Sequence, residues 1–110
     1  MSVYASLTPQ QLAAWIQTEP RPRLLDVRQP EEHELAALPD STLIPLGELF
    51  HRVEELEAWK NEDVVVYCHH GVRSLNAIAQ LKHLGFQKLY NLTGGIDRWS
   101  TEVDPKVPRY

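Results

Sequence analysis

The chain has 110 residues, a length that suits one compact domain with a single hydrophobic core. Its formal net charge of −4 argues against general nucleic-acid binding, which needs a basic surface. The sequence contains neither an apolar run of about 20 residues nor a basic start followed by an apolar stretch, so we expect no membrane span and no secretory signal. The single cysteine cannot form an internal disulfide, which favours a reducing compartment, and we expect a cytoplasmic protein.

The first half of the chain predicts short elements of alternating type. In order, they are a helix at 6–17, a buried strand at 24–27, one or two helical turns at 30–35, a strand at 41–45 and a helix from 46 to about 60. Thr8 is a suitable cap for the first helix, and Pro9 fits the first turn. Leu49, Val53 and Leu56 recur at helical spacing, which predicts the helix after residue 46.

The second half continues this alternation. Its elements are a strand at 63–68, a helix at 74–85, a strand at 88–92, a tight turn at 93–95 and a short helix at 96–100. Strands that alternate with helices indicate an α/β layer fold with a largely parallel sheet. Ligands bind beyond the carboxyl ends of the strands in such sheets, and Cys68 is predicted to lie there.

Cys68 stands between the apolar run "DVVVY" and the turn "HHGV", which a helix follows from Arg73 or Ser74. Gly71 permits backbone angles that other residues resist, so the turn can curl around the sulfur and direct several N–H groups toward it. The helix N-terminus and Arg73 add positive charge, and both favour thiolate over thiol. A thiolate in such an anion cradle can attack an anionic sulfur or phosphorus compound.

The distribution of charge agrees with an anionic substrate. Residues 1–63 carry 5 Lys and Arg against 12 Asp and Glu, whereas residues 64–110 carry 6 against 3. The thiol has two alternative roles. One is a buried structural cysteine. The other is a zinc site of Cys68, His69 and His70, which is disfavoured because three consecutive residues rarely converge on one ion.

Four segments in this order resemble the rhodanese family of sulfurtransferases in its single-domain form. "LLDVRQPEEHEL" is similar to the family's Asp-Val-Arg-x-x-x-Glu-Tyr segment, with His33 in the aromatic position. "LPDSTLIPLGEL" matches the following strand and proline, "VVVYCHHGVRS" the active-site loop, and "LTGGIDRWSTEVDPKVPRY" the closing Gly-Gly-x-x-x-Trp element. The family often has Gly-His-Ile-x-Gly-Ala where this chain has "AALPDS", a departure that leaves the chemistry intact.

The resemblance implies a single rhodanese-like domain over residues 1–110. Its three-layer fold would have a mostly parallel central sheet of about five strands, flanked by helices. Cys68 would take a sulfane sulfur from a donor such as thiosulfate, and cyanide or a thiol would then remove it from the persulfide. The backbone amides that would hold the persulfide belong to His69, His70, Gly71, Val72, Arg73 and Ser74. Arg73 would also attract the donor's sulfonate, and no metal or organic cofactor is implied.

Two alternatives concern the acceptor and the reaction. The chain could be a persulfide carrier that hands its sulfur to one protein partner, with the same chemistry on Cys68. Phosphatases and arsenate reductases of the same fold have one more residue between Cys and Arg. The four residues between Cys68 and Arg73 favour sulfur transfer over these enzymes. The expected partners are therefore a small anionic sulfur donor and a thiol or protein acceptor, and a monomer is expected.

Asp26 and Arg28 end a predicted strand on the side where Cys68 should lie. Either Arg28 adds positive potential to the pocket, or both residues are structural. In the structural reading, Asp26 accepts hydrogen bonds and Arg28 pairs with an acid such as Glu32. The roles of His69 and His70 also stay open. They would bind an anion when charged, below about pH 6.5, or face solvent at the pocket rim.

Overall fold

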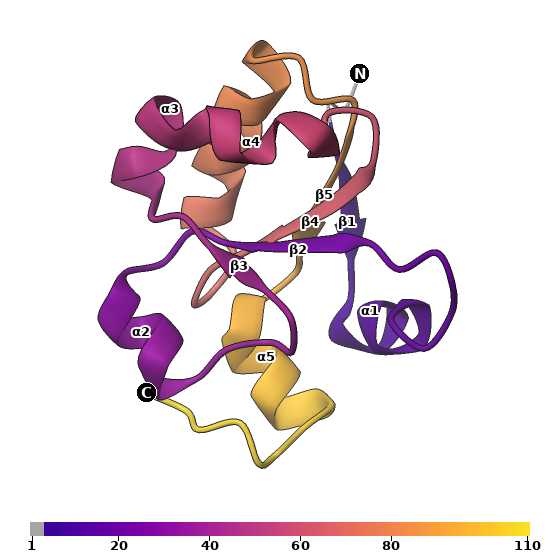
Figure 1. Ribbon diagram of the computed structural model, residues 1–110. Coiled ribbons are helices and arrows are strands. Elements are labelled where there is room, and N and C mark those ends of the chain that lie inside the picture. Colours follow the sequence, from indigo (N-terminus) through magenta and orange to yellow (C-terminus); the bar gives the residue numbers. More distant parts are fainter. Residues whose placement is uncertain (1–3) are drawn as a thin grey trace.

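The computed structural model describes residues 4–110, in which strands and helices alternate along the chain (Figure 1). The strands are β1 (Ala5–Leu7), β2 (Arg23–Asp26), β3 (Thr42–Leu43), β4 (Asp63–Tyr67) and β5 (Lys88–Leu92). The α-helices are α1 (Pro9–Trp15), α2 (Pro30–Leu35), α3 (Leu49–Arg52), α4 (Arg73–His83) and α5 (Gly95–Glu102). Two 3-10 segments, η1 (Leu46–Glu48) and η2 (Val53–Trp59), flank α3.

The five strands form one sheet in the order β1-β5-β4-β2-β3, and every neighbouring pair is parallel. The predicted α/β fold with a parallel sheet is therefore confirmed. The central strand, β4, is buried from Val64 to Tyr67, as its β-branched, apolar sequence predicts. The last residues of β2 and β4 lie side by side, because Asp26 pairs in register with Tyr67.

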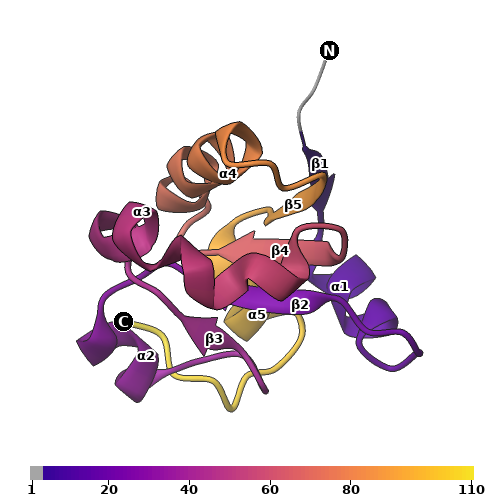
Figure 2. The same ribbon diagram turned by 45° about the horizontal axis from the view of Figure 1, so that its top comes forward.

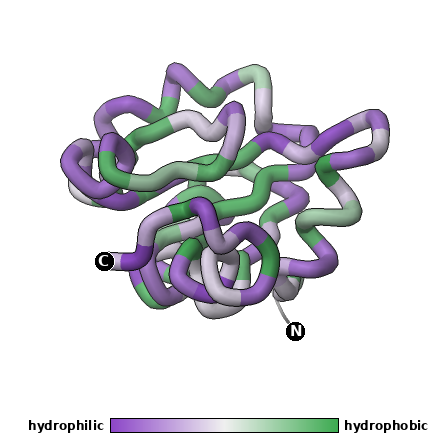
Figure 3. Tube along the Cα trace, turned by 90° about the horizontal axis from the view of Figure 1, so that it is seen from below, coloured by the Kyte–Doolittle hydropathy of each residue, from purple (hydrophilic) through white to green (hydrophobic). Residues whose placement is uncertain are grey.

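Side chains of β4 alternate between two cores. Val64 and Val66, together with Cys68 directly after the strand, pack in one core with α3 and α4, whereas Val65 and Tyr67 pack in the other with α1 and α5. Figures 1 and 2 show the resulting layers, with α3 and α4 over one face of the sheet and α1, α2 and α5 over the other. In Figure 3, hydrophobic segments run through the middle of the molecule.

Two elements differ from the sequence predictions. The short strand β1 was not predicted, and it includes two residues of the predicted helix at 6–17. It is mostly exposed, and its parallel pairing with β5 sets Ala5 opposite Tyr90. Such pairing depends on a distant partner rather than on a local pattern.

The single helix predicted from 46 to about 60 is instead divided into η1, α3 and η2. Val53, Leu56 and Trp59 recur every third residue, which suits the three residues per turn of a 3-10 helix. All three pack against the core below α3 and α4.

Candidate active site around Cys68

Cys68 directly follows β4 at the carboxyl edge of the sheet. The connection that leaves β2 passes through α2 on one face, and the connection that leaves β4 passes through α4 on the other (Figure 1). Ligands bind in parallel sheets where two such connections diverge. Cys68 is only 1% exposed, and its sulfur lies inside the turn that leads into α4.

The turn holds the sulfur through two groups. The Gly71 amide donates to Cys68 Sγ at 3.0 Å, and the thiol donates to Ser74 Oγ at 3.5 Å. Gly71 has φ of +95°, a conformation that glycine adopts without strain. The structure therefore brings together three of the predicted loop residues. Contact of the amides of His69, His70, Val72, Arg73 and Ser74 with an outer sulfur stays a prediction.

Asn91 in β5 forms hydrogen bonds with two residues of this turn. Ser74 Oγ donates to Asn91 Oδ1 at 2.5 Å, and Asn91 Nδ2 donates to the Gly71 carbonyl oxygen at 3.4 Å. Asn91 is almost completely buried. The sequence reasoning missed it, although an amide side chain inside the apolar strand "KLYNL" was a signal, since buried polar groups require partners.

The start of α5 closes against the same turn. The Ile96 and Asp97 amides donate to the carbonyl oxygens of Cys68 and His69, at 2.9 and 3.1 Å. Gly95 has φ of +63°, and a Cβ there would come within 2.5 Å of the Cys68 carbonyl oxygen. The glycines read from sequence as turn residues thus permit a close approach of two backbones at the site.

Arg73 reaches from the first turn of α4 to α2. Its Nη1 and Nη2 donate to Glu32 Oε1 and Oε2 at 2.7 and 2.8 Å, and the Tyr110 hydroxyl donates to Glu32 Oε2 at 2.7 Å. The hydrogen bonds from Arg73 are the main reason that the pKa of Glu32 falls to about 2. The same contacts raise the pKa of Arg73. An anion that approaches Arg73 must therefore compete with a carboxylate.

Asp26 and Arg28 form a completely buried ion pair. Arg28 Nε and Nη2 donate to the two Asp26 oxygens at 2.9 and 2.7 Å, and Nη1 donates to the Tyr110 hydroxyl at 2.7 Å. Although burial lowers the pKa of Arg28, its hydrogen bonds to Asp26 and Tyr110 raise it overall.

Arg28 pairs with an acid, as the structural reading predicts, but the acid is Asp26 and not Glu32. Glu32 offers Arg28 only its backbone carbonyl oxygen, at 3.4 Å, because its carboxylate is bound by Arg73. Asp26 also accepts a hydrogen bond from the Arg28 amide and lies 2.8 Å from His33 Nδ1. The carboxylate therefore neutralises Arg28, and the geometry favours a structural role for this pair.

The two histidines after Cys68 lie in a stack with the end of the chain. The rings of His69 and His70 are 3.9 Å apart between centroids, and Tyr110 stacks on His69 at 3.9 Å, inclined by 9°. Burial, followed by the nearby His70, lowers the pKa of His69. The side chain of His70 is 63% exposed, in keeping with a place at the rim.

The end of the chain contributes to the site, which the sequence reasoning missed. Arg109 Nε and Nη2 donate to the two oxygens of Asp97 at 2.9 and 3.2 Å, and these contacts lower the pKa of Asp97. Ligand atoms of His69, His70 and Asp97 lie within 4.8 Å of one another. Nothing in the proline-containing sequence of this tail indicates these contacts.

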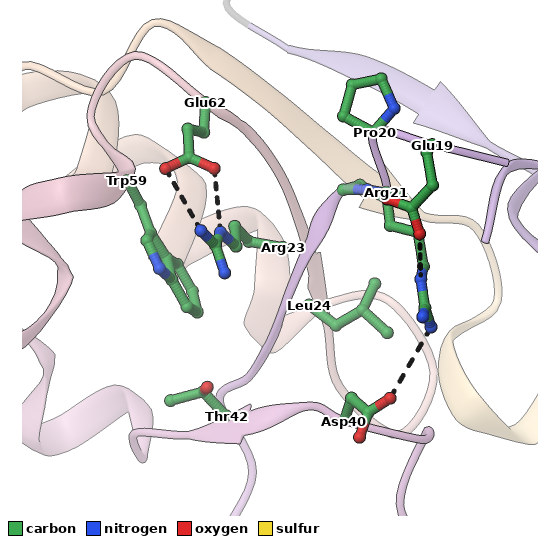
Figure 4. A pocket seen from close by; sticks show the side chains of 10 residues that line it. Glu19, Pro20, Arg21, Arg23, Leu24, Asp40, Thr42, Trp59 and Glu62 are labelled. Atoms are coloured by element: carbon green, nitrogen blue, oxygen red, sulfur yellow. Dashed lines mark hydrogen bonds and ion pairs between the residues drawn. The ribbon is translucent and has the colours of Figure 1, made fainter.

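A cavity of about 420 Å³ lies at the opposite, amino edge of the sheet (Figure 4). Arg23 and Glu62 form an ion pair on its wall beside Trp59, and Leu24 and Asp40 line the other side. Its lining contains no cysteine, serine or histidine, so Cys68 remains the better candidate for a nucleophile. Within residues 4–110, no helix has the length and apolar character needed to cross a membrane.

Comparison with known proteins agrees with this geometry. Residues 8–102 match the family described as "Rhodanese-like domain". A rhodanese-related protein from Thermoplasma volcanium has a solved structure that is 32% identical, with a TM-score of 0.79, covering 91% of this chain and 94% of that one. A match of lower identity is a possible tyrosine phosphatase from Rhodopseudomonas palustris, which is 21% identical with a TM-score of 0.78. The match covers 97% of this chain and 85% of that one, and it shows a shared fold alone.

Two curated relatives carry names that refer to sulfur. The putative sulfur carrier protein YrkF of Bacillus subtilis is 38% identical over 74% of this chain and 43% of its own length. The adenylyltransferase and sulfurtransferase uba4 of Ogataea parapolymorpha is 36% identical over 81% of this chain and 23% of its own length. The chain thus spans less than half the length of these relatives.

Proposed function

The chain belongs to the rhodanese-like domain family, and we propose that it transfers a sulfane sulfur from a donor such as thiosulfate to a thiophilic acceptor through a persulfide on Cys68. The observation that carries this proposal is the Gly71 amide pointing at Cys68 Sγ inside a turn closed by Ser74 and Asn91. An amide donor held in place can stabilise negative charge that develops on the sulfur during transfer, without reorganisation.

The chemistry takes two displacements. The Cys68 thiolate attacks the outer sulfur of thiosulfate, a new S–S bond forms, and the original S–S bond breaks with sulfite leaving. Cyanide or a thiolate then attacks the outer sulfur of the persulfide. The bond to Cys68 breaks, the thiolate is regenerated, and thiocyanate or a new persulfide leaves. No net oxidation occurs, and ping-pong kinetics are expected.

Arg73 would bind the sulfonate of the donor. Its guanidinium is partly exposed and lies in the first turn of α4, five residues after the nucleophile. Because Glu32 already occupies it, an anionic donor would have to share or displace this carboxylate. Arg73 is therefore proposed to determine how well thiosulfate is used, while Cys68 and its turn perform the chemistry.

A persulfide carrier is the second candidate, and its support is the 38% identity to the putative sulfur carrier protein of Bacillus subtilis. Its acceptor would be the thiol of a protein partner, and the chain itself would act as a monomer in the reducing cytoplasm. Rapid turnover with small thiols would favour the enzyme. Slow turnover that one protein partner accelerates would favour the carrier.

The intact mass of the protein before and after thiosulfate tests the shared first step. We expect a gain of one sulfur atom that cyanide reverses, and no gain in Cys68→Ser. Melting of the variant near the wild-type temperature would show that the fold is intact. An unchanged wild-type mass, or an equal gain in the variant, would overturn the proposal. Hydrolysis of an aryl phosphate by the wild type would then favour a phosphatase.

A further inference from the structure

His69, His70 and Asp97 form a cluster that sulfur transfer does not require. The histidines follow the nucleophile in the turn, and Asp97 lies in the first turn of α5. Their ligand atoms lie within 4.8 Å of one another, and His70 Nε2 is 3.9 Å from Asp97 Oδ2. Cys68 is not part of this group, since its sulfur is directed to Gly71 and Ser74.

Backbone contacts hold the three residues in place. The Asp97 amide donates to the His69 carbonyl oxygen at 3.1 Å, and the preceding amide donates to the Cys68 carbonyl oxygen. The absence of a side chain at Gly95 permits this approach. The cluster therefore depends on a fixed junction between the turn and α5, not on an accidental meeting of surface side chains.

One imidazole nitrogen in the cluster is unsatisfied. His69 Nε2 is buried and has no hydrogen-bond partner within residues 4–110. A buried polar atom without a partner is costly. Its ring lies between those of His70 and Tyr110. Because an imidazole binds a metal in its own ring plane, His70 must leave this stack for both histidines to bind one ion.

We propose that His69, His70 and Asp97 bind one divalent transition-metal ion of the zinc type, beside the Cys68 turn. Two imidazoles and a carboxylate suit Zn²⁺, Co²⁺ or Ni²⁺ better than Mg²⁺ or Ca²⁺, which prefer oxygen ligands. Bonds of about 2.1 Å require ligand atoms about 3.4 Å apart, so the three side chains must move closer, and His70 must rotate out of its stack on His69, to surround an ion. The third ligand is Asp97 of α5 rather than Cys68, so only two of the three ligands are adjacent in the chain.

The Asp97 carboxylate already has a partner, since Arg109 Nε lies 2.9 Å from its Oδ1. Arg109 therefore competes with a metal for the Asp97 carboxylate. Since the side chain of Arg109 is 62% exposed, it can move into solvent when an ion arrives.

Cobalt binding to untagged Cys68→Ser protein tests the site in the absence of the thiol. We expect one equivalent of Co²⁺ to give a saturable visible absorption band, which Zn²⁺ removes by competition. His70→Ala and Asp97→Asn should weaken binding by at least about tenfold, as loss of a ligand does. Arg109→Gln should strengthen it several-fold, because it removes the competing cation.

His83→Ala is the matched control, since His83 is an exposed histidine of α4 outside the cluster, and it should leave the affinity unchanged. Absence of a saturable band in Cys68→Ser would overturn the proposal, as would a band that His70→Ala and Asp97→Asn leave unchanged. Weaker binding in Arg109→Gln would also count against it. Because every sample lacks the nucleophile, these results are independent of whether the protein transfers sulfur.

Discussion

The two edges of the sheet use similar side chains in different ways. At the carboxyl edge, Asp26 and Arg28 pair with no exposed surface, and Glu32 is mostly covered where it meets Arg73. At the amino edge, Arg23 pairs with Glu62 around the cavity of Figure 4, with side chains 49% and 43% exposed. Exposed pairs are worth at most about 1 kcal/mol, whereas breaking a buried pair costs about 3–5 kcal/mol.

This difference has a structural origin. The carboxyl edge is covered by segments that are far apart in the sequence, namely α2, the start of α5 and the end of the chain. They bury the Asp26–Arg28 pair completely and bring Glu32 and Tyr110 to the two arginines. The amino edge is open, so the charged side chains of Arg23 and Glu62 remain in contact with water. Substitutions at matched positions of the two edges should therefore differ in effect.

The largest difference is expected for Asp26→Asn compared with Asp40→Asn. Loss of the Asp26 charge leaves Arg28 buried and uncompensated, which should lower the free energy of unfolding by about 3–5 kcal/mol. Asp40 is exposed and lies 3.8 Å from Arg21, so its substitution should change stability by less than about 0.5 kcal/mol. Urea unfolding measures both values. Equal losses would contradict the contrast between the edges.

Gly95→Ala should be the next most damaging change. The backbone at this position has a positive φ, which alanine adopts only with strain, and the added Cβ would collide with the Cys68 carbonyl oxygen. We therefore expect the free energy of unfolding to fall by about 2–4 kcal/mol and sulfur loading to be impaired. Gly47→Ala is the control, because its Cβ would meet nothing within 4 Å. Thermal unfolding and sulfur loading of both variants test the close approach. A fully stable, active Gly95→Ala protein would refute it.

Arg73→Ala should reduce kcat/KM for thiosulfate by about 10–100-fold, the value of a charge-assisted hydrogen bond to the donor. Most of this loss should appear in KM. Arg23→Ala removes an arginine of the amino edge and should leave the kinetics unchanged. Steady-state assays with cyanide as acceptor compare the two variants. An unchanged kcat/KM in Arg73→Ala would exclude this residue from donor binding.

Glu32→Gln should lower stability less than Asp26→Asn or Gly95→Ala, and its effect should depend on pH. The pKa of Glu32 is lowered to about 2 in the folded protein from 4.5, so its stabilisation is complete above about pH 5 and disappears as the pH falls toward 2. We expect a difference from the wild type on the order of 2 kcal/mol at pH 7.

Glu54→Gln is the corresponding control, since Glu54 is exposed and forms no ion pair within residues 4–110. Unfolding of both variants at pH 7, 5 and 3 tests the prediction. If the difference between Glu32→Gln and the wild type is the same at pH 7 and pH 3, the ion pair with Arg73 is not its cause.

Local sequence determined the central part of this protein. The β-branched run of β4 predicted a buried strand, Gly71 a tight turn, and the apolar spacing after Ser74 a helix, and together they located Cys68 at the carboxyl edge. These features depend on interactions between neighbouring residues, which a sequence pattern records directly. The resemblance to a family, with all four of its segments in order, added the chemistry expected of the thiol.

Only the tertiary structure decided which partners meet. Arg28 binds Asp26, two residues away, while Glu32 binds Arg73, 41 residues away. Tyr110, the last residue of the sequence, stacks on His69, and β1, near the first residue, pairs with β5. Several acids were available to each arginine, and no local pattern distinguishes them. The choice follows from how the layers bring distant segments to one edge of the sheet, where burial makes each pairing specific.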